Sequence, residues 1–215
     1  HDKLIAAGHE DGRWYLELAG RWLARLHKAA LTVTAVDEFK QREEGRIRNY
    51  LARFEKINHR HTARARQIAE TIMAAEQDRS CSHDCLVQGH GDFHPKNIMI
   101  GQDSQDNRDT LFVAAIDFGS SLMLPPAFDV GTFLAQYRNQ LFNHQELLER
   151  LPERIFLDAY LDEGPPAGDD FLWQVELFRA RTNLSIAAFL IRVGMGESQD
   201  LWRVLVEAEQ SLSQI

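Results

Sequence analysis

Two short stretches of this chain carry most of its chemical information: His90-Gly-Asp-Phe-His-Pro-Lys-Asn97 and, further along, Ile116-Asp-Phe-Gly119. Together they hold two acids and an amide, each at or beside the end of a short apolar run that predicts a β-strand. Pro95 stiffens the loop between Asp92 and Asn97, because its ring restricts the backbone dihedral φ. We therefore expect these polar side chains to be presented in a defined geometry at the ends of strands.

Phosphoryl transfer requires this combination of side chains. A carboxylate must orient the attacking hydroxyl and accept its proton, and hard oxygen ligands must hold Mg²⁺ against the phosphate oxygens. Asp92 lies five residues before Asn97, so a turn between two strands can direct one side chain to the substrate and the other to the metal. Asp117, which follows the next strand, can complete the metal site.

The spacing of apolar residues along the rest of the chain predicts a mainly helical protein. Helices are expected over 13–31, 37–57, 61–78, 127–140, 144–162, 169–193 and 197–213, and strands over 85–88, 97–100 and 111–116. The last two strands should pair as a hairpin, because the segment 101–110 between them has turn residues throughout. Helices, a small β insert and further helices together indicate an α+β architecture.

The composition is that of an ordinary folded protein and narrows the range of partners. The chain has 215 residues, of which 44% are hydrophobic and 26% charged, with a formal net charge of −8. A general nucleic-acid binder needs a basic face to displace counterions, so that class is excluded. The acidic surplus is compatible with a cationic ligand, although surface carboxylates also serve solubility.

The sequence also bears on the cellular compartment. Its two cysteines cannot form a disulfide framework, so nothing indicates an oxidising environment. No apolar run approaches the length of a membrane span, and no signal peptide is visible. These features predict a cytoplasmic protein without a membrane partner.

The combined pattern H-G-D-F-H-P-K-N followed by I-D-F-G resembles the catalytic loop and metal-binding segment of the aminoglycoside phosphotransferase family, which shares the protein kinase fold. The resemblance covers most of the chain. Leu23-Ala-Arg-Leu-His27 looks like the first long helix of that family's C-terminal lobe, and Pro125-Pro-Ala-Phe-Asp-Val-Gly131 looks like the segment after its metal site. The resemblance therefore implies a kinase-like C-terminal lobe, with the β insert carrying the catalytic loop.

The resemblance also implies roles for single residues. Asp92 corresponds to the catalytic base, and Asn97 and Asp117 correspond to the ligands of Mg²⁺. Asp129 should support the catalytic loop through hydrogen bonds to its backbone, and His90 should orient the loop rather than react. The implied phosphoryl donor is ATP or GTP.

Two departures from protein kinases indicate a small-molecule acceptor. A glycine follows His90 where protein kinases have arginine, and only the eleven residues 118–128 separate Asp117 from Asp129. That length is too short for an activation loop with a peptide-docking segment. Acceptors in the resembled family include aminoglycosides, macrolides, choline and homoserine, and the later helices, here within 127–213, usually build the acceptor walls.

The nucleotide-clamping half of such a site is not found in this sequence. A complete enzyme of the family has an N-terminal lobe with a phosphate-covering loop and a paired lysine and glutamate, whereas Gly8 and Gly12 form no G-x-G-x-x-G turn here. We therefore expect residues 1–215 to be the C-terminal lobe alone, with the other lobe supplied in cis or by a partner chain. The isolated chain should be nearly inactive. The alternative is a kinase-like binding module without catalysis.

Other residues near the motif have weaker assignments. Lys96 can contact the γ-phosphate, or it can be a solvated loop lysine. His94 is expected to pack within the loop. The cluster Cys81-Ser-His83-Asp-Cys85 could bind zinc, but common zinc sites pair such a motif with a second, distant one, so a polar loop before a buried strand is favoured.

Two further features have both a functional and a structural interpretation. The acidic pairs Asp162-Glu163 and Asp169-Asp170 could line a site for a cationic acceptor, but a solvated loop with a helix-capping aspartate is favoured. Four tryptophans lie at amphipathic helical positions and are expected in the core or at a lobe interface: Trp14, Trp22, Trp173 and Trp202. Trp14 and Tyr15 should be exposed if another lobe docks beside them.

Overall fold

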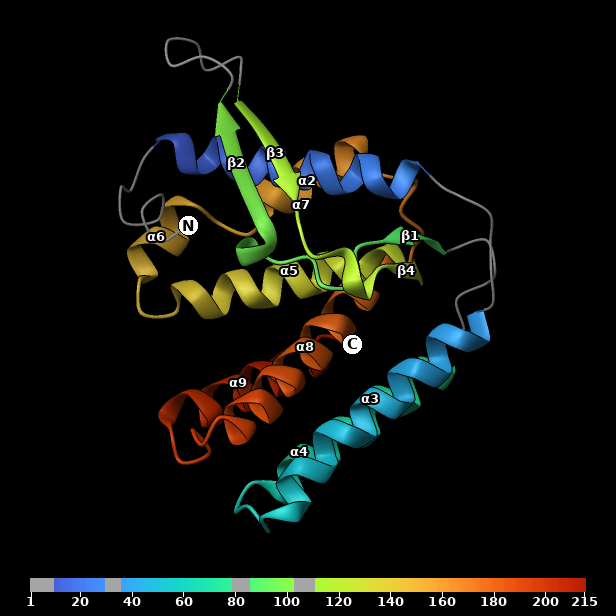
Figure 1. Ribbon diagram of the computed structural model, residues 1–215, viewed down its shortest axis with the longest axis vertical. Coiled ribbons are helices and arrows are strands. Elements are labelled where there is room, and N and C mark those ends of the chain that lie inside the picture. Colours follow the sequence, from blue (N-terminus) through green and yellow to red (C-terminus); the bar gives the residue numbers. More distant parts are fainter. Residues whose placement is uncertain (1–9, 30–35, 79–85, 103–110) are drawn as a thin grey trace.

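The computed structural model describes residues 10–29, 36–78, 86–102 and 111–215. Within them the chain forms the helices α2 (Glu10–Lys28), α3 (Val36–Lys56), α4 (Thr62–Asp78), α5 (Pro126–Leu141), α6 (Gln145–Arg150), α7 (Arg154–Glu163), α8 (Phe171–Arg192) and α9 (Gln199–Leu212). The strands are β1 (Val87–Gly89), β2 (Ile98–Gln102), β3 (Leu111–Ala115) and β4 (Leu122–Leu124). The predicted mainly helical α+β fold is confirmed (Figure 1).

One predicted helix is wrong in its extent. The segment 144–162 is two helices, α6 and α7, separated at Leu151 and Pro152. Proline has no backbone N–H to donate and its ring clashes with the preceding helical turn, so it ends a helix. Here the Pro152 carbonyl instead accepts from the backbone N–H of Ile155 at 3.0 Å, in the first turn of α7.

The strands form two small antiparallel sheets. β2 and β3 pair from Ile98 opposite Ala115 to Gln102 opposite Leu111, which confirms the predicted hairpin. The hairpin tip, 103–110, lies outside the described residues. β1 pairs instead with β4, a strand that the sequence analysis missed, with Gly89 opposite Leu122. Both sheets therefore bracket the loop from His90 to Asn97.

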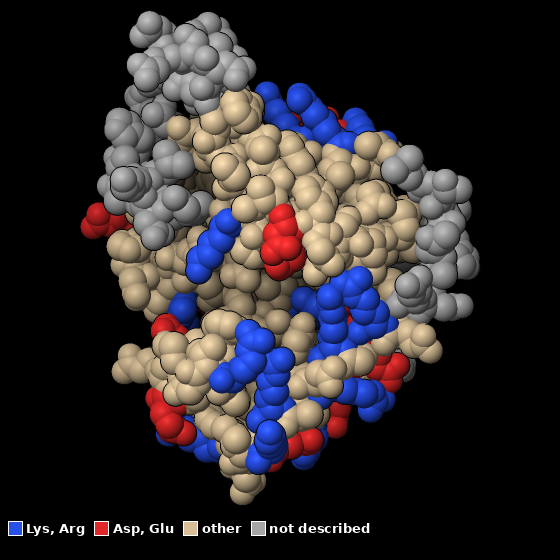
Figure 2. All heavy atoms as spheres, in the orientation of Figure 1, with Lys and Arg blue, Asp and Glu red and all other residues tan. Residues whose placement is uncertain are grey.

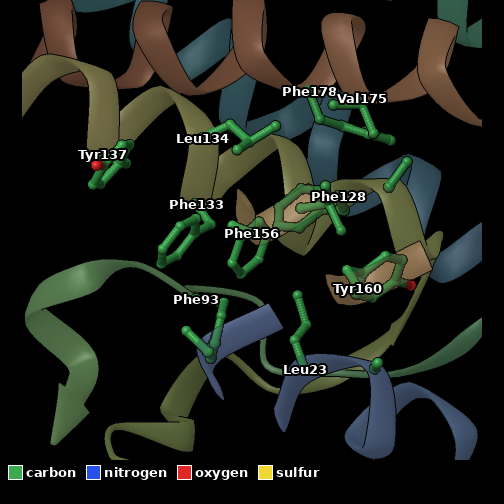
Figure 3. Packing of buried hydrophobic residues seen from close by; sticks show 14 of the residues in the cluster. Leu23, Phe93, Phe128, Phe133, Leu134, Tyr137, Phe156, Tyr160, Val175 and Phe178 are labelled. Carbon is green, nitrogen blue, oxygen red and sulfur yellow. The ribbon is translucent and has the colours of Figure 1, made fainter. Parts of the chain in front are cut away.

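A first hydrophobic core lies between α2, α5, α7 and the loop after β1 (Figure 3). The rings of Phe133 and Phe156 stack with centroids 3.9 Å apart. Phe93, which has no exposed surface, packs on both rings and stacks on Trp22 with centroids 5.6 Å apart. Since Phe93 directly follows Asp92, the core anchors the loop at the residue beside the predicted base.

A second hydrophobic core holds α3, α4, α8 and α9 together, and these helices form the lower part of the molecule in Figure 1. α8 connects the two cores: Val175 and Phe178 pack in the first, whereas Leu177 and Leu184 pack in the second. Among the described residues, no helix is long and apolar enough to cross a bilayer.

Candidate active site

The second residue of the loop between β1 and β2 is a glycine that no other residue could replace without strain. Gly91 has a φ of +77°, in the left-handed region that side chains disfavour. A Cβ atom at this position would also lie 2.0 Å from the carbonyl oxygen of Ser120. The catalytic loop and the segment after Asp117 are therefore in direct backbone contact.

His90 is fully buried, and both of its ring nitrogens have partners. Nε2 lies 2.9 Å from the carbonyl oxygen of Ile116, so it must be the protonated nitrogen. Nδ1 then accepts from the backbone N–H of Asp92, at 3.3 Å. Because this neutral tautomer uses both nitrogens to join the two motifs, the geometry agrees with an orienting role for His90 rather than a reactive one.

Asp129 lies beneath the loop and has no exposed surface. Its carboxylate accepts from the backbone N–H groups of His90, at 2.6 Å, and of Gly91, at 2.9 Å. Hydrogen bonds to a charged acceptor are about twice as strong as neutral ones. These are the contacts that a residue supporting the catalytic loop should make.

Two residues of this network were not identified from the sequence. His27 of α2 lies with Nε2 3.2 Å from Asp129 Oδ2, and its Nδ1 lies 2.8 Å from the hydroxyl of Tyr160 on α7. A consistent arrangement has Tyr160 donating to His27 and His27 donating to Asp129. The sequence did carry a weak signal, since His27 lies four residues after Leu23 on the apolar stripe of its helix.

Asn97 lies at the end of a 3₁₀ turn, η2 (Pro95–Asn97), and its side chain turns back toward Asp92. Nδ2 donates to the backbone carbonyl of Asp92 at 3.0 Å and lies 3.5 Å from the carboxylate oxygen Oδ2. This contact fixes which way the amide faces and leaves its oxygen, Oδ1, as the atom that can coordinate a cation. The structure therefore places the side chains of Asp92 and Asn97 next to each other.

Asp117 follows β3 and has left-handed backbone dihedrals, φ 65° and ψ 59°. It precedes a second 3₁₀ turn, η4 (Phe118–Ser120), and makes no capping hydrogen bond with it. The preceding residue, Ile116, donates its backbone N–H to the carbonyl of Asn97 at 2.9 Å. The two predicted metal ligands, Asn97 and Asp117, therefore lie at the same end of the β2–β3 hairpin. Asp117 is exposed to solvent.

His94 interacts with the predicted base, which is more than the loop-packing role expected of it. Its Nδ1 accepts from the backbone N–H of Lys96 at 3.2 Å, so Nε2 carries the proton and faces Asp92 Oδ2 at 3.7 Å. The donor group of His94 lowers the pKa of the Asp92 carboxyl, against partial burial, which raises it. Asp92 is consequently a carboxylate at neutral pH.

Comparison with known families identifies the chain at this point. The family model described as the phosphotransferase enzyme family matches residues 4–171, a range that contains both motifs and Asp129. This chain belongs to the phosphotransferase enzyme family. The resemblance inferred from the motifs is thereby confirmed. A comparison with curated protein sequences gave no match.

Solved structures of small-molecule kinases share the fold of this chain. An ethanolamine kinase from Plasmodium vivax superposes with a TM-score of 0.61 at 14% identity, covering 94% of this chain and 59% of the other. A glucosamine kinase bound to glucosamine, ADP and phosphate gives a TM-score of 0.60 at 20% identity, covering 96% and 54%. An amicoumacin kinase bound to AMP-PNP gives 0.63 at 14% identity, covering 94% and 59%. The chain thus has a kinase-like fold and spans little more than half the length of these proteins.

The remaining charged residues that the sequence analysis singled out do not lie together. Lys96 is exposed on the loop beside Asp92. On the face of the molecule drawn in Figure 2, a small acidic patch lies in the middle, with Lys and Arg side chains on either side of it. Glu163 instead pairs with Arg21 and Arg25 of α2, at 3.4 and 3.0 Å, so it is engaged in ion pairs rather than lining an open acceptor site.

Other predictions have mixed outcomes. Asp170 stands at the N-cap of α8, but its side chain makes no capping hydrogen bond with the helix. Trp22 packs against the first core as predicted, whereas Trp202 is 52% exposed and does not lie in a core. Trp14 is 36% exposed, which agrees with the exposure expected of it beside a second lobe. The proposed zinc cluster, 81–85, lies outside the described residues. Within the described ranges, no group of three or more His, Cys, Asp or Glu side chains could hold a metal ion.

Proposed function

We propose that this phosphotransferase transfers the γ-phosphoryl group of ATP or GTP to a hydroxyl of a small molecule, with Asp92 as the catalytic base. The observation that carries the proposal is the joint placement of Asp92 and Asn97: Asn97 Nδ2 donates to the backbone carbonyl of Asp92 at 3.0 Å and lies 3.5 Å from the Asp92 carboxylate. Asp117 is presented from the adjoining end of the hairpin. A carboxylate and two hard oxygen donors at one point are the groups that this reaction needs.

Asp92 suits an orienting base. Its lowered pKa keeps it ionised, with His94 as the main cause, so it can accept a hydrogen bond from an incoming hydroxyl at neutral pH. A carboxylate of lowered pKa is a weak base. Its contribution is therefore to align the hydroxyl and to take the proton as the bond to phosphorus forms, rather than to create a free alkoxide beforehand.

The side chains at this end of the hairpin fit a magnesium ion. Asn97 Oδ1 and the Asp117 carboxylate are hard oxygen donors, and Mg²⁺ characteristically takes one or two such protein ligands and completes its shell with water and phosphate oxygens. When bound, Mg²⁺ would neutralise charge on the phosphate groups. Asn97 is held for this role by its own bond to the Asp92 backbone, and Asp117 by the pairing of β2 with β3.

We further propose that the acceptor combines a hydroxyl with an amine, as an amino alcohol or amino sugar does. The named acceptors of two structurally similar kinases, ethanolamine and glucosamine, share that combination. The nucleotide clamp would come from an N-terminal lobe, in cis or on a partner chain. Complexes of similar kinases with ADP and with AMP-PNP support a nucleotide donor.

The test is phosphoryl transfer by the full-length protein. The protein is incubated with Mg²⁺, ATP or GTP and a panel of amino alcohols and amino sugars, and acceptor-dependent ADP or GDP release is measured. Asp92→Asn should abolish transfer while binding of the Mg²⁺–nucleotide survives, and Asp117→Asn should weaken that binding. Equal loss of nucleotide binding in both variants would refute these roles. Nucleotide binding with no turnover on any acceptor would favour a non-catalytic module.

A further inference from the structure

The segment after Asp117 receives a side chain from outside both motifs. Arg42, on α3, donates from Nη2 to the backbone carbonyl of Ser120 at 3.3 Å. The two residues are 78 positions apart in the chain. Ser120 ends the turn η4, and the last carbonyl of a helical turn has no partner within the turn, so a cationic donor is a favourable one.

The carbonyl that Arg42 contacts is the one that touches the catalytic loop. A Cβ on Gly91 would lie 2.0 Å from Ser120 O and 2.8 Å from Ser120 C, so these two backbones are in van der Waals contact. Next to them, Ser121 Oγ donates to the carbonyl of Gly89 at 2.6 Å. The position of the Ser120 carbonyl therefore sets how closely Asp117 and Asp92, on the two segments, can approach.

The neighbouring residue on α3, Glu43, anchors this part of the helix to α8. Glu43 is 1% exposed and accepts from Arg181 Nε on α8 at 2.7 Å. The guanidinium of Arg181 in turn lies 4.8 Å from the ring centroid of Phe128, the residue before Asp129. Two consecutive residues of α3 are thus connected to the surroundings of the loop. Arg42 contacts the Ser120 carbonyl, and Glu43 contacts the start of α5 through Arg181.

We propose that Arg42 is a positioning residue that α3 supplies to the candidate active site, fixing the Ser120 carbonyl against Gly91 and so the spacing between Asp92 and Asp117. The expected effect of Arg42 on kcat rests on the proposed function, whereas its expected effect on the rigidity of the loop does not. Displacing a reacting group by about 1 Å can cost about 100-fold in rate, so a contact at this point can control turnover.

The kinetic test compares Arg42→Ala, Arg42→Lys and Arg48→Ala in the full-length protein. Arg48 is the matched control, because it lies on the same helix and pairs with Glu44 on its own helix. Arg42→Ala should lower kcat about 10-fold to 100-fold while KM for the Mg²⁺–nucleotide changes less than about 3-fold. Arg42→Lys keeps a donor and should restore most of kcat. A kcat for Arg42→Ala equal to that of Arg48→Ala would overturn the proposal, as would a raised KM with unchanged kcat, which would mean direct contact with the nucleotide.

A second measurement needs no turnover. Amide hydrogen exchange at Gly91 and Ser121 should be about 10-fold faster in Arg42→Ala than in Arg48→Ala, because the loop and its neighbour lose a shared restraint. Unchanged exchange would reject the positioning role. If the wild-type protein phosphorylated none of the acceptors, the proposed function would fail, yet this exchange comparison would still decide the role of Arg42. Arg42→Met, which keeps an unbranched side chain without a donor, serves in the same comparison if Arg42→Ala does not fold.

Discussion

His27 Nε2 and Asp129 Oδ2 lie 3.2 Å apart, and neither side chain has exposed surface. Through this contact α2 reaches the residue that binds the catalytic-loop backbone, and Tyr160 extends the connection to α7 at 2.8 Å. A buried carboxylate that loses a donor, with a hydroxyl left unpaired beside it, is costly because neither group can bond to water instead. The stability of the loop should therefore depend on His27.

His27→Leu should lower the free energy of unfolding by about 2–4 kcal/mol, since the buried Asp129 carboxylate loses one of its three donors and the Tyr160 hydroxyl loses its contact with His27. Tyr160→Phe removes only the outer bond and should cost about 1 kcal/mol. Urea denaturation of both variants measures the difference. A loss for Tyr160→Phe as large as that for His27→Leu would show that the network does not run through the histidine.

Gly91→Ala should destabilise the protein by more than about 2 kcal/mol, because the site combines a positive φ with a backbone clash. Gly45→Ala is a control of opposite sign. Gly45 lies within α3 with nothing within 4 Å of an added Cβ, so alanine there should stabilise by about 0.5–1 kcal/mol. Thermal unfolding of the two variants gives the comparison, and a tolerated Gly91→Ala would contradict the described loop geometry.

His94→Ala should raise the pKa of Asp92 toward its ordinary value, because the main cause of its depression is removed. Since the folded pKa lies below the unfolded one, the His94 contact stabilises the protein above the unfolded pKa and loses its effect as the pH falls through the folded pKa. An NMR titration of the Asp92 carboxyl measures the shift. His144→Ala, an exposed histidine before α6, is the control and should leave that titration unchanged.

Glu76, on α4, should make stability fall between about pH 4.5 and 7. Burial, followed by the charge of Glu43, raises its pKa from 4.5 to about 7, whereas Arg181 and Lys40 oppose the shift and Glu44 adds to it. The folded state therefore holds this proton over a pH range in which the unfolded state has lost it, so folding weakens as the pH rises through that window. Above about pH 7, the buried, ionised Glu76 carboxylate destabilises the folded state.

Glu76→Gln removes the ionisation and should flatten that dependence, stabilising the protein at pH 8 by about 1–3 kcal/mol relative to wild type. Glu70→Gln, at an exposed position of the same helix, should change neither the slope nor the stability appreciably. Denaturation at pH 5, 6, 7 and 8 provides the measurement. Identical pH profiles for wild type and Glu76→Gln would mean that Glu76 titrates normally.

Much of the candidate site could be predicted because its chemistry is contiguous. His90 to Asn97 fall within one loop, and Asp117 follows the next strand, so the residue types and their spacing already favour the phosphoryl-transfer site that we propose. Pro152 also marks the break between α6 and α7 in the sequence. The prediction of a single helix followed the helical spacing of the flanking apolar residues instead. β4 is only three residues long, and its identity as a strand depends on pairing with β1.

By itself the sequence determined the helical period, the hairpin and the set of acids and amide from which the family resemblance was inferred. Only the tertiary structure decided which distant residues hold them: His27 and Tyr160 beside Asp129, and Arg42 against Ser120. These contacts join positions up to 133 residues apart, and each depends on burial and on the relative placement of helices. Local spacing encodes which groups lie on a loop, but the strength and direction of a hydrogen bond depend on what the rest of the fold brings within reach.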